Sequence, residues 1–437
     1  MAGSSEGRAA GYRGEESLLS RSPRKALWVI VASGTLTVMA GAILGPVVNG
    51  IQSGLGVSGS LAGVIITTHG LFIVLTSPVA GSLIDRYGPR RPYVLGLVLY
   101  ALAGSAGLVV DSFAILLASR AALGVAVAFV YTSITVLIYN LFEDERKDRA
   151  MGLRGSANSL GAAVWPLFGG VLGTISWQLP FGVYLLALPL GVLAYLTVPE
   201  PTIVPERRDP EDTSEGGVRG ITSLFVRTPL LVLVYGLFFA ANALLYAIVV
   251  YYPQLLAGFS VSSAFVISLY LSVLGIAGGV SAYFYDRIKR RFEHRQLTFV
   301  ALGLWLAGFS LAAVASTRAL ALLPVVLFGL GQGLVFPTVL LWVEELVPTD
   351  RQGQFSSYVA MAGYVGQFLS PVLFGLMSAR SVSGQCSPLR RPSLVSRSLS
   401  PVAGTQCGSS RYREFSVPLP STYSSQHSYC EAVPQGS

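Results

Sequence analysis

The sequence predicts an all-α polytopic membrane protein, and three features of its composition and charge pattern support this. Hydrophobic residues make up 52% of the 437 residues and charged residues only 12%, against about 25% charged residues in ordinary soluble domains. Residues 26–84, 155–199 and 228–285 contain no Asp, Glu, Lys or Arg. A soluble protein would need charged loops between its apolar segments, but every second connection here has almost no charge. The short segments of alternating apolar and polar residues that are typical of a β-barrel are not seen either.

The first charge-free block, residues 26–84, is too long for one membrane crossing and suits two helices, because a crossing needs roughly 20 apolar residues. The next two apolar stretches lie on either side of Asp111, and the block 155–199 again divides into a pair. Gly and Pro inside these stretches do not argue against helices, since neighbouring helices in lipid can satisfy the freed backbone groups. We therefore expect six spans in the first half, near 26–49, 61–84, 93–110, 112–138, 156–174 and 178–198.

A linker rich in Glu, Asp, Arg and Pro, residues 201–228, follows the sixth span and has the composition of a cytoplasmic hinge between two bundles. The block 228–285 divides into two spans, two more follow the basic loop after it, and the last ends near residue 378. The second half is therefore expected to contain five spans, near 229–252, 262–284, 296–316, 319–343 and 354–378.

Lys and Arg residues gather in the segment 1–25 and in the loops that follow every even-numbered span. The opposite connections contain a single basic residue, Arg318. This asymmetry predicts that the amino terminus and the basic loops lie in the cytoplasm, in a protein of the plasma membrane. The net charge of +8 is explained by this topology, so we do not expect nucleic-acid binding. We assign four basic residues to the loop between the fourth and fifth spans: Arg146, Lys147, Arg149 and Arg154.

The turn between the second and third spans, residues 81–92, gathers four charges in an otherwise charge-free region. The Gly88-Pro89 pair turns the chain, and the arginines can anchor the turn on the cytoplasmic side. Anchoring does not explain Asp85, which could accept hydrogen bonds from the free N–H groups of a neighbouring helix end. Nor does it explain Gly81, whose small size would let another helix approach closely.

The segment Gly81-Ser-Leu-Ile-Asp-Arg-Tyr-Gly-Pro-Arg-Arg91 resembles the loop 2–3 signature of the major facilitator superfamily, G-x-L-x-D-R-x-G-R-R/K. The resemblance covers about residues 26–378. It implies a transporter of two six-helix bundles around a central cavity, in which this loop locks a gate. The residues that match the gating signature are Gly81, Asp85, Arg86, Gly88, Arg90 and Arg91.

An internal repeat points the same way, because the charged turn recurs as Asp286-Arg287-Ile-Lys-Arg-Arg about 200 residues later. A parallel repeat of half the chain predicts two related bundles with the substrate between them. In the second copy Lys289 stands where Gly88 would be, and Ala282 stands where Gly81 would be. We therefore expect the second loop to contribute less to gating.

Few polar side chains lie within the predicted spans. Arg120 lies near the middle of the fourth span, and since a charge there is costly it must face a cavity or polar partners. It is followed by small residues, which resembles a family pattern in which the Arg takes part in proton coupling; the alternative is a structural Arg bound to backbone carbonyls. His69 could titrate during transport or hydrogen-bond between helices as a neutral ring. The candidates for coupling or for lining the cavity are Arg120, His69, Tyr131, Asn242 and Gln332.

The fifth span contains Gly161-Ala-Ala-Val-Trp-Pro-Leu-Phe-Gly-Gly170. It resembles the antiporter signature of the family, G-x-x-x-G-P-x-x-G-G, with Trp165 in place of the Gly before Pro166. Antiport is the implied mechanism, and a kinked contact between small residues is the alternative. The residues of this motif are Gly161, Pro166, Gly169 and Gly170.

The family pattern and the repeat both expect a twelfth span, yet the tail 379–437 is rich in Ser, Pro and Arg and has no apolar run of sufficient length. We expect a 6 + 5 arrangement that lacks the twelfth helix, with a disordered tail that could come from a shifted reading frame.

The sequence therefore predicts a secondary transporter that works by alternating access, with proton-coupled efflux favoured. An uptake facilitator, a symporter and a truncated, transport-deficient product remain as alternatives. The expected partners are a small-molecule substrate, protons and the lipid bilayer, with the chain as a monomer. Neither catalysis nor a cofactor or metal is expected, because no phosphate loop is present and no cysteine precedes Cys386. Without an Asp or Glu near the middle of a span, neutral or anionic solutes should be favoured over cations.

Overall fold

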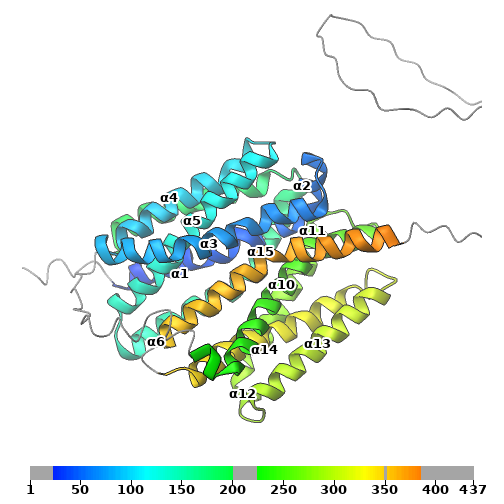
Figure 1. Ribbon diagram of the computed structural model, residues 1–437. Helices are drawn as coiled ribbons and strands as arrows, with labels where there is room; N and C mark the ends of the chain where they lie inside the picture. Colours follow the sequence, from blue (N-terminus) through cyan, green and yellow to red (C-terminus); the bar gives the residue numbers. More distant parts are fainter. Residues whose placement is uncertain (1–22, 200–223, 349–351, 385–437) are drawn as a thin grey trace, which may run out of the picture. The chain divides into compact units, whose positions relative to one another are not determined.

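The computed structural model describes residues 23–199, 224–348 and 352–384, and in these ranges the regular structure is helical, with no strand (Figure 1). Most of the predicted tail, residues 385–437, and most of the predicted linker lie outside the described residues. The last helix continues to Gly384, which is beyond the predicted end of the eleventh span.

Each of the six spans predicted in the first half is helical. The first is broken by the 3₁₀ turn at Gly45–Val47, where Pro46 removes a backbone donor. Ser58 caps the second, accepting a hydrogen bond from Leu61 N at 3.3 Å. The elements are α1 (Pro23–Ala42), η1 (Gly45–Val47), α2 (Val48–Leu55), α3 (Gly59–Tyr87), α4 (Arg90–Ser105), η2 (Ala106–Leu108), α5 (Phe113–Leu141), α6 (Asp144–Gly173), η3 (Leu179–Leu186) and α7 (Ala187–Thr197).

The five spans predicted in the second half are also helical. A short helix follows the second of them and carries the repeated charged turn. The helix after that turn begins with a capping box, in which Glu293 and Gln296 each bind the other's backbone N–H. The elements are α10 (Pro229–Gly258), α11 (Ala264–Tyr283), α12 (Tyr285–Lys289), α13 (His294–Val314), α14 (Leu322–Leu346) and α15 (Gln352–Gly384).

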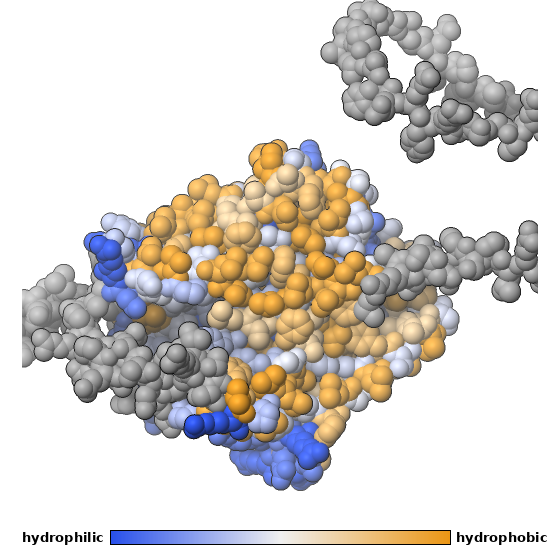
Figure 2. All heavy atoms as spheres, in the orientation of Figure 1, coloured by the Kyte–Doolittle hydropathy of each residue, from blue (hydrophilic) through white to orange (hydrophobic). Residues whose placement is uncertain are grey.

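Ten helices of the described chain are long and apolar enough to cross a membrane. The remaining predicted span is α6, whose first eleven residues hold seven charged side chains and lower its average hydropathy. Figure 2 shows apolar side chains across the middle of the visible face and hydrophilic ones towards its ends, as expected for helices in lipid. The number of crossings stays a prediction.

The two halves repeat the same helix packing. In the first half α5 packs against α3 and α4, and α1 packs against α6; in the second half α14 packs against α11 and α13, and α10 packs against α15. Two separate groups of buried hydrophobic side chains form the interiors, one drawn almost wholly from residues 26–198 and one from residues 231–359. The halves meet mainly where α6 packs on α11 and α3 packs on α15.

Candidate transport site and gates

The contacts between the halves gather at the end of the helices where α2, η1 and the α10–α11 connection lie. Asn49 Nδ2 donates to the carbonyl of Pro253 at 3.0 Å, and the hydroxyls of Ser60 and Tyr251 lie 3.2 Å apart. The sequence-based topology predicts that this is the outer end, and the helices of the two halves are in contact there. Gly63 in α3 is part of the same contact, because a Cβ there would lie 2.8 Å from Pro371 of α15.

A buried contact between the halves joins His69 of α3 to Gln367 of α15. The ring Nε2 and the amide Nε2 lie 3.1 Å apart, and both side chains are buried. At this position the amide donates to an unprotonated ring nitrogen. The other ring nitrogen, Nδ1, is also buried. His69 therefore lies where the two halves meet; that it lines a transport cavity stays a prediction.

Arg120 lies inside the first half and is fully buried. Its Nη2 donates to the carbonyls of Ala103 and Gly104 at 3.2 and 2.6 Å, and its guanidinium lies 5.0 and 4.9 Å from the ring centroids of Phe181 and Tyr184. These carbonyls belong to the last turn of α4, where intrahelical donors run out. This geometry is that of the structural alternative, an Arg that binds a helix end to its neighbours; its proton-coupling role remains a proposal.

Arg154 was assigned to the loop between the fourth and fifth spans, and this assignment is wrong. It lies within α6, and its side chain is 6% exposed. Its Nη1 donates to the hydroxyl of Thr135 at 2.8 Å, and its guanidinium lies 4.6 Å from the ring centroid of Tyr131. The charge run from Asp144 onward is the start of the helix itself, and only its later part turns into the protein. Tyr131 therefore has a charged neighbour that the sequence did not reveal.

The other two cavity candidates lie in the second half. Asn242 Nδ2 donates to the carbonyl of Phe238 one turn earlier at 2.9 Å, so part of its capacity is used within α10. Gln332 Nε2 is 3.4 Å from the carbonyl of Ala241, while its Oε1 is buried without a partner among the described residues. Gln332 thus ties α14 to α10, and its free oxygen is a candidate acceptor.

The turn between α3 and α4 shows why a glycine ends α3. Gly88 has φ +81°, a conformation that other residues rarely adopt, and its N–H binds the carbonyl of Ile84 at 2.9 Å. Arg90 donates to the carbonyl of Tyr195 and lies 4.8 Å from the centroid of its ring, which holds α4 to the end of α7. Arg86 lies 5.4 Å from the ring of Tyr87, and Arg91 is exposed.

Two expectations for this turn are not met. A Cβ at Gly81 would meet no atom of the described residues within 4 Å, so the close approach inferred from its small size is not seen in this conformation. Asp85 is exposed and has no hydrogen bond to any residue that the structure describes. The contacts between the halves gather at the opposite end of the helices, so a gating contact of Asp85 is not seen among the described residues.

The repeated turn after α11 is held by an ionic cluster. Asp286 is exposed at the start of α12, and Arg287 lies 5.7 Å from the ring of Phe284. Glu345 of α14 lies 3.5 Å from Lys289 Nζ and 2.9 Å from His294 Nε2.

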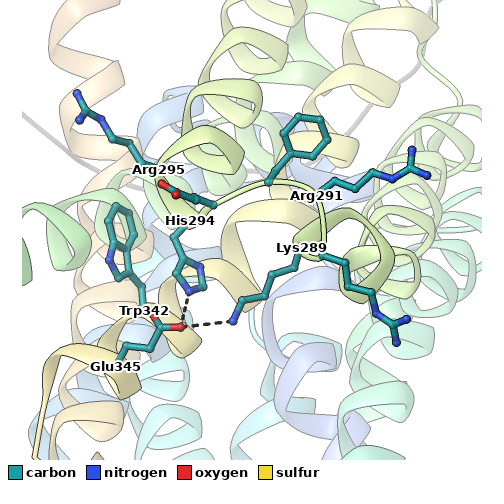
Figure 3. Close-up of a pocket in the computed structure, with 9 residues that line it drawn as sticks. Lys289, Arg291, His294, Arg295, Trp342 and Glu345 are labelled. Atoms are coloured by element: carbon teal, nitrogen blue, oxygen red, sulfur yellow. Dashed lines mark hydrogen bonds and ion pairs between the residues drawn. The ribbon is translucent and has the colours of Figure 1, made fainter.

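Figure 3 shows Lys289 and His294 converging on Glu345, while Arg291 and Arg295 point away from it. Trp342 stacks on His294, with centroids 5.7 Å apart and 18° between the rings, and these residues line a cavity of about 560 Å³. Lys289, which replaces the turn glycine of the first copy, therefore contributes an ion pair to the second half.

The glycine motif of the fifth span forms two helix contacts. A Cβ at Gly169 would lie 1.9 Å from the carbonyl oxygen of Ile43, in the turn between α1 and η1, and one at Gly170 would lie 2.2 Å from the hydroxyl of Ser268 in α11. Gly161 faces the Trp165 ring, whose Nε1 donates to the carbonyl of Thr35 at 3.1 Å. The motif, with Pro166 inside the helix, thus packs α6 on both halves.

The family model described as Major Facilitator Superfamily matches residues 30–371. The chain belongs to this superfamily. The multidrug resistance protein 1 of Bacillus subtilis (strain 168) is 25% identical over 335 residues, covering 76% of this chain and 84% of that protein. The quinolone resistance protein NorA of Staphylococcus aureus (strain MRSA252) is 24% identical over 336 residues, covering 73% and 82%.

Solved structures share the fold of this Major Facilitator Superfamily chain. A bacterial homologue of the human lysosomal transporter Spinster, inward-facing and unoccupied, matches with a TM-score of 0.70 at 16% identity and covers 83% of this chain and 84% of that one. A D-xylose–proton symporter matches with a TM-score of 0.68 at 16% identity, covering 81% and 90%. The predicted family and the all-α membrane fold are confirmed, and the chain is an integral membrane transporter of small molecules rather than an enzyme.

Proposed function

We propose that this chain exports amphiphilic small molecules from the cytoplasm by alternating access, in exchange for protons, as a monomer in the plasma membrane. The Lys and Arg distribution supports a cytoplasmic amino terminus. The relatives named for multidrug and quinolone resistance support drug-like substrates. With the outer end closed, the conformation is the one in which a substrate would enter from the cytoplasm.

The observation that carries proton coupling is the His69–Gln367 contact between the halves. Protonation turns the ring nitrogen from an acceptor into a donor, so the amide that now donates to it must move. The charged ring would also be buried, and no carboxylate lies within ion-pair distance of it among the described residues. A proton on His69 therefore opposes the contact that holds the halves together.

The test is transport of a fluorescent quinolone, norfloxacin, into inside-out vesicles with an acidic interior. We expect the proton gradient to accelerate uptake about tenfold or more. The His69→Gln variant should keep downhill exchange but lose the response to the gradient, because glutamine can hydrogen-bond but cannot titrate. His294→Gln is the matched control. It removes a buried histidine from the ionic cluster with Lys289 and Glu345, away from the contact between the halves, and should retain the response to the gradient.

The outcomes separate the alternatives. Flux of the wild type that ignores the gradient would indicate a facilitator, and flux in the direction of the proton would indicate a symporter. A correctly inserted protein without any flux would indicate a transport-deficient product. A gradient response retained in His69→Gln would remove His69 from the coupling mechanism.

A further inference from the structure

Arg154 is a buried cation with little to neutralise it. It lies ten residues into α6, about 15 Å along the helix at 1.5 Å per residue. A guanidinium carries five N–H donors, yet the described partners are one hydroxyl, that of Thr135, and the face of Tyr131. Both ion pairs in the described part of the chain involve Glu345, so neither reaches Arg154.

The contrast with Arg120 shows which of the two buried arginines has donors to offer. Nε and Nη1 of Arg120 are inaccessible to solvent and have no hydrogen-bond partner among the described residues. No nitrogen of Arg154 is both inaccessible and unpartnered. Since the described residues provide Arg154 with one hydrogen bond, its remaining donors face space that a ligand or water can reach.

The position of Arg154 is next to the seam between the halves. A Cβ on Gly34 of α1 would lie 3.6 Å from its Cγ, and Thr135 and Tyr131 belong to α5, so two neighbouring helices of the first half pack around this side chain of α6. From the second half, Tyr364 of α15 packs against the hydrophobic interior of the first half. The backbone of Tyr364 is itself part of the seam, because its carbonyl oxygen would lie 3.2 Å from a Cβ on Gly70.

We propose that Arg154 is the anion-binding residue of the transport site, and that the transported molecules carry a carboxylate on an apolar or aromatic body. Arginine pairs with a carboxylate through two parallel hydrogen bonds. The rings of Tyr131 and Tyr364 provide apolar and aromatic surface on both sides of the seam for the remainder of the molecule. The inference rests on the proposed transport function and names the class of substrate.

The test measures equilibrium binding of 2-naphthoate and 2-naphthamide to the purified full chain in detergent. The two probes have nearly the same size and differ in charge. We expect the wild type to bind the carboxylate about tenfold tighter or more, the range of a charge-assisted pair. Arg154→Gln should remove the preference, and Arg154→Lys should retain only part of it because an ammonium cannot form the paired fork.

Arg146→Gln is the matched control, since it removes the same charge from an exposed position on the same helix; it should leave the preference unchanged. Thermal unfolding of each variant separates lost binding from lost folding. If Arg154→Gln does not fold, the wild type and Arg154→Lys still decide the question. Equal affinity of the wild type for both probes, or a full preference in Arg154→Lys or Arg154→Gln, would overturn the inference. Because binding is measured without flux, a failure here is distinguishable from a failure of the proposed export.

Discussion

At the scale of single residues, Asp85 allows the gate to be tested. It is exposed and unbonded among the described residues while the outer end is closed, so a gating contact can form only when the inner ends approach. We expect Asp85→Asn to insert and fold normally but to reduce norfloxacin transport about tenfold or more, through loss of a charge-assisted bond in the other conformation. Asp111→Asn, at an exposed position between α4 and α5, is the control and should transport normally. Normal transport by Asp85→Asn would exclude a gating role.

The residue scale is also where the sequence was least informative. The position of Arg120 within a span was predictable, because a charge in an apolar run is conspicuous. Its partners were not, since the carbonyls of Ala103 and Gly104 leave no signal in the identity of a side chain. Arg154 was missed because it ends a run of charges that reads as a loop. The acidic residues Asp144 and Glu145, a pair typical of the first turn of a helix, were the available signal that α6 begins earlier.

At the scale of elements, substitutions at the two adjacent glycines of α6 should affect two different properties, the stability of the protein and its conformation. Gly169 contacts Ile43, just after α1 in its own half, whereas Gly170 contacts α11 in the other half. Gly169→Ala should lower the free energy of unfolding by about 1–3 kcal/mol, the usual cost of overpacking. Gly170→Ala should leave the first half intact but keep the outer end from closing. With Asn49→Cys introduced into both proteins, labelling of this cysteine should then be greater in Gly170→Ala than in the protein with the natural Gly170.

Gly155→Ala is the matched control, because a Cβ there meets nothing within 4 Å; its stability should stay within about 1 kcal/mol of the wild type. Equal labelling in Gly170→Ala and the wild type would show that the α6–α11 contact does not limit closure. Helix positions such as these follow from apolar length and were predicted well. Which glycine faces which half was not, because both neighbours depend on the packing of segments about 100 residues apart.

At the scale of the whole molecule, the repeat predicted two related bundles, and the packing of α3, α4 and α5 does recur in α11, α13 and α14. The conformation could not be predicted, because a transporter has at least two arrangements of the same helices and the sequence encodes both. The outer closure is carried by contacts such as the 3.0 Å bond from Asn49 to Pro253. Transport by alternating access requires these contacts to break in every cycle.

A disulfide across the outer end should therefore stop transport. A Cβ on Gly375 of α15 would lie 2.8 Å from the Cβ of Ser60 in α3, and a shift of about 1 Å would reach the usual disulfide spacing of roughly 3.8 Å. With Cys386, Cys407 and Cys430 replaced by serine, the Ser60→Cys/Gly375→Cys variant should lose norfloxacin transport on oxidation and regain it on reduction. Each single-cysteine variant should transport equally well under both conditions. Undiminished transport by the oxidised, fully cross-linked protein would show that the two halves do not separate at this end during the cycle.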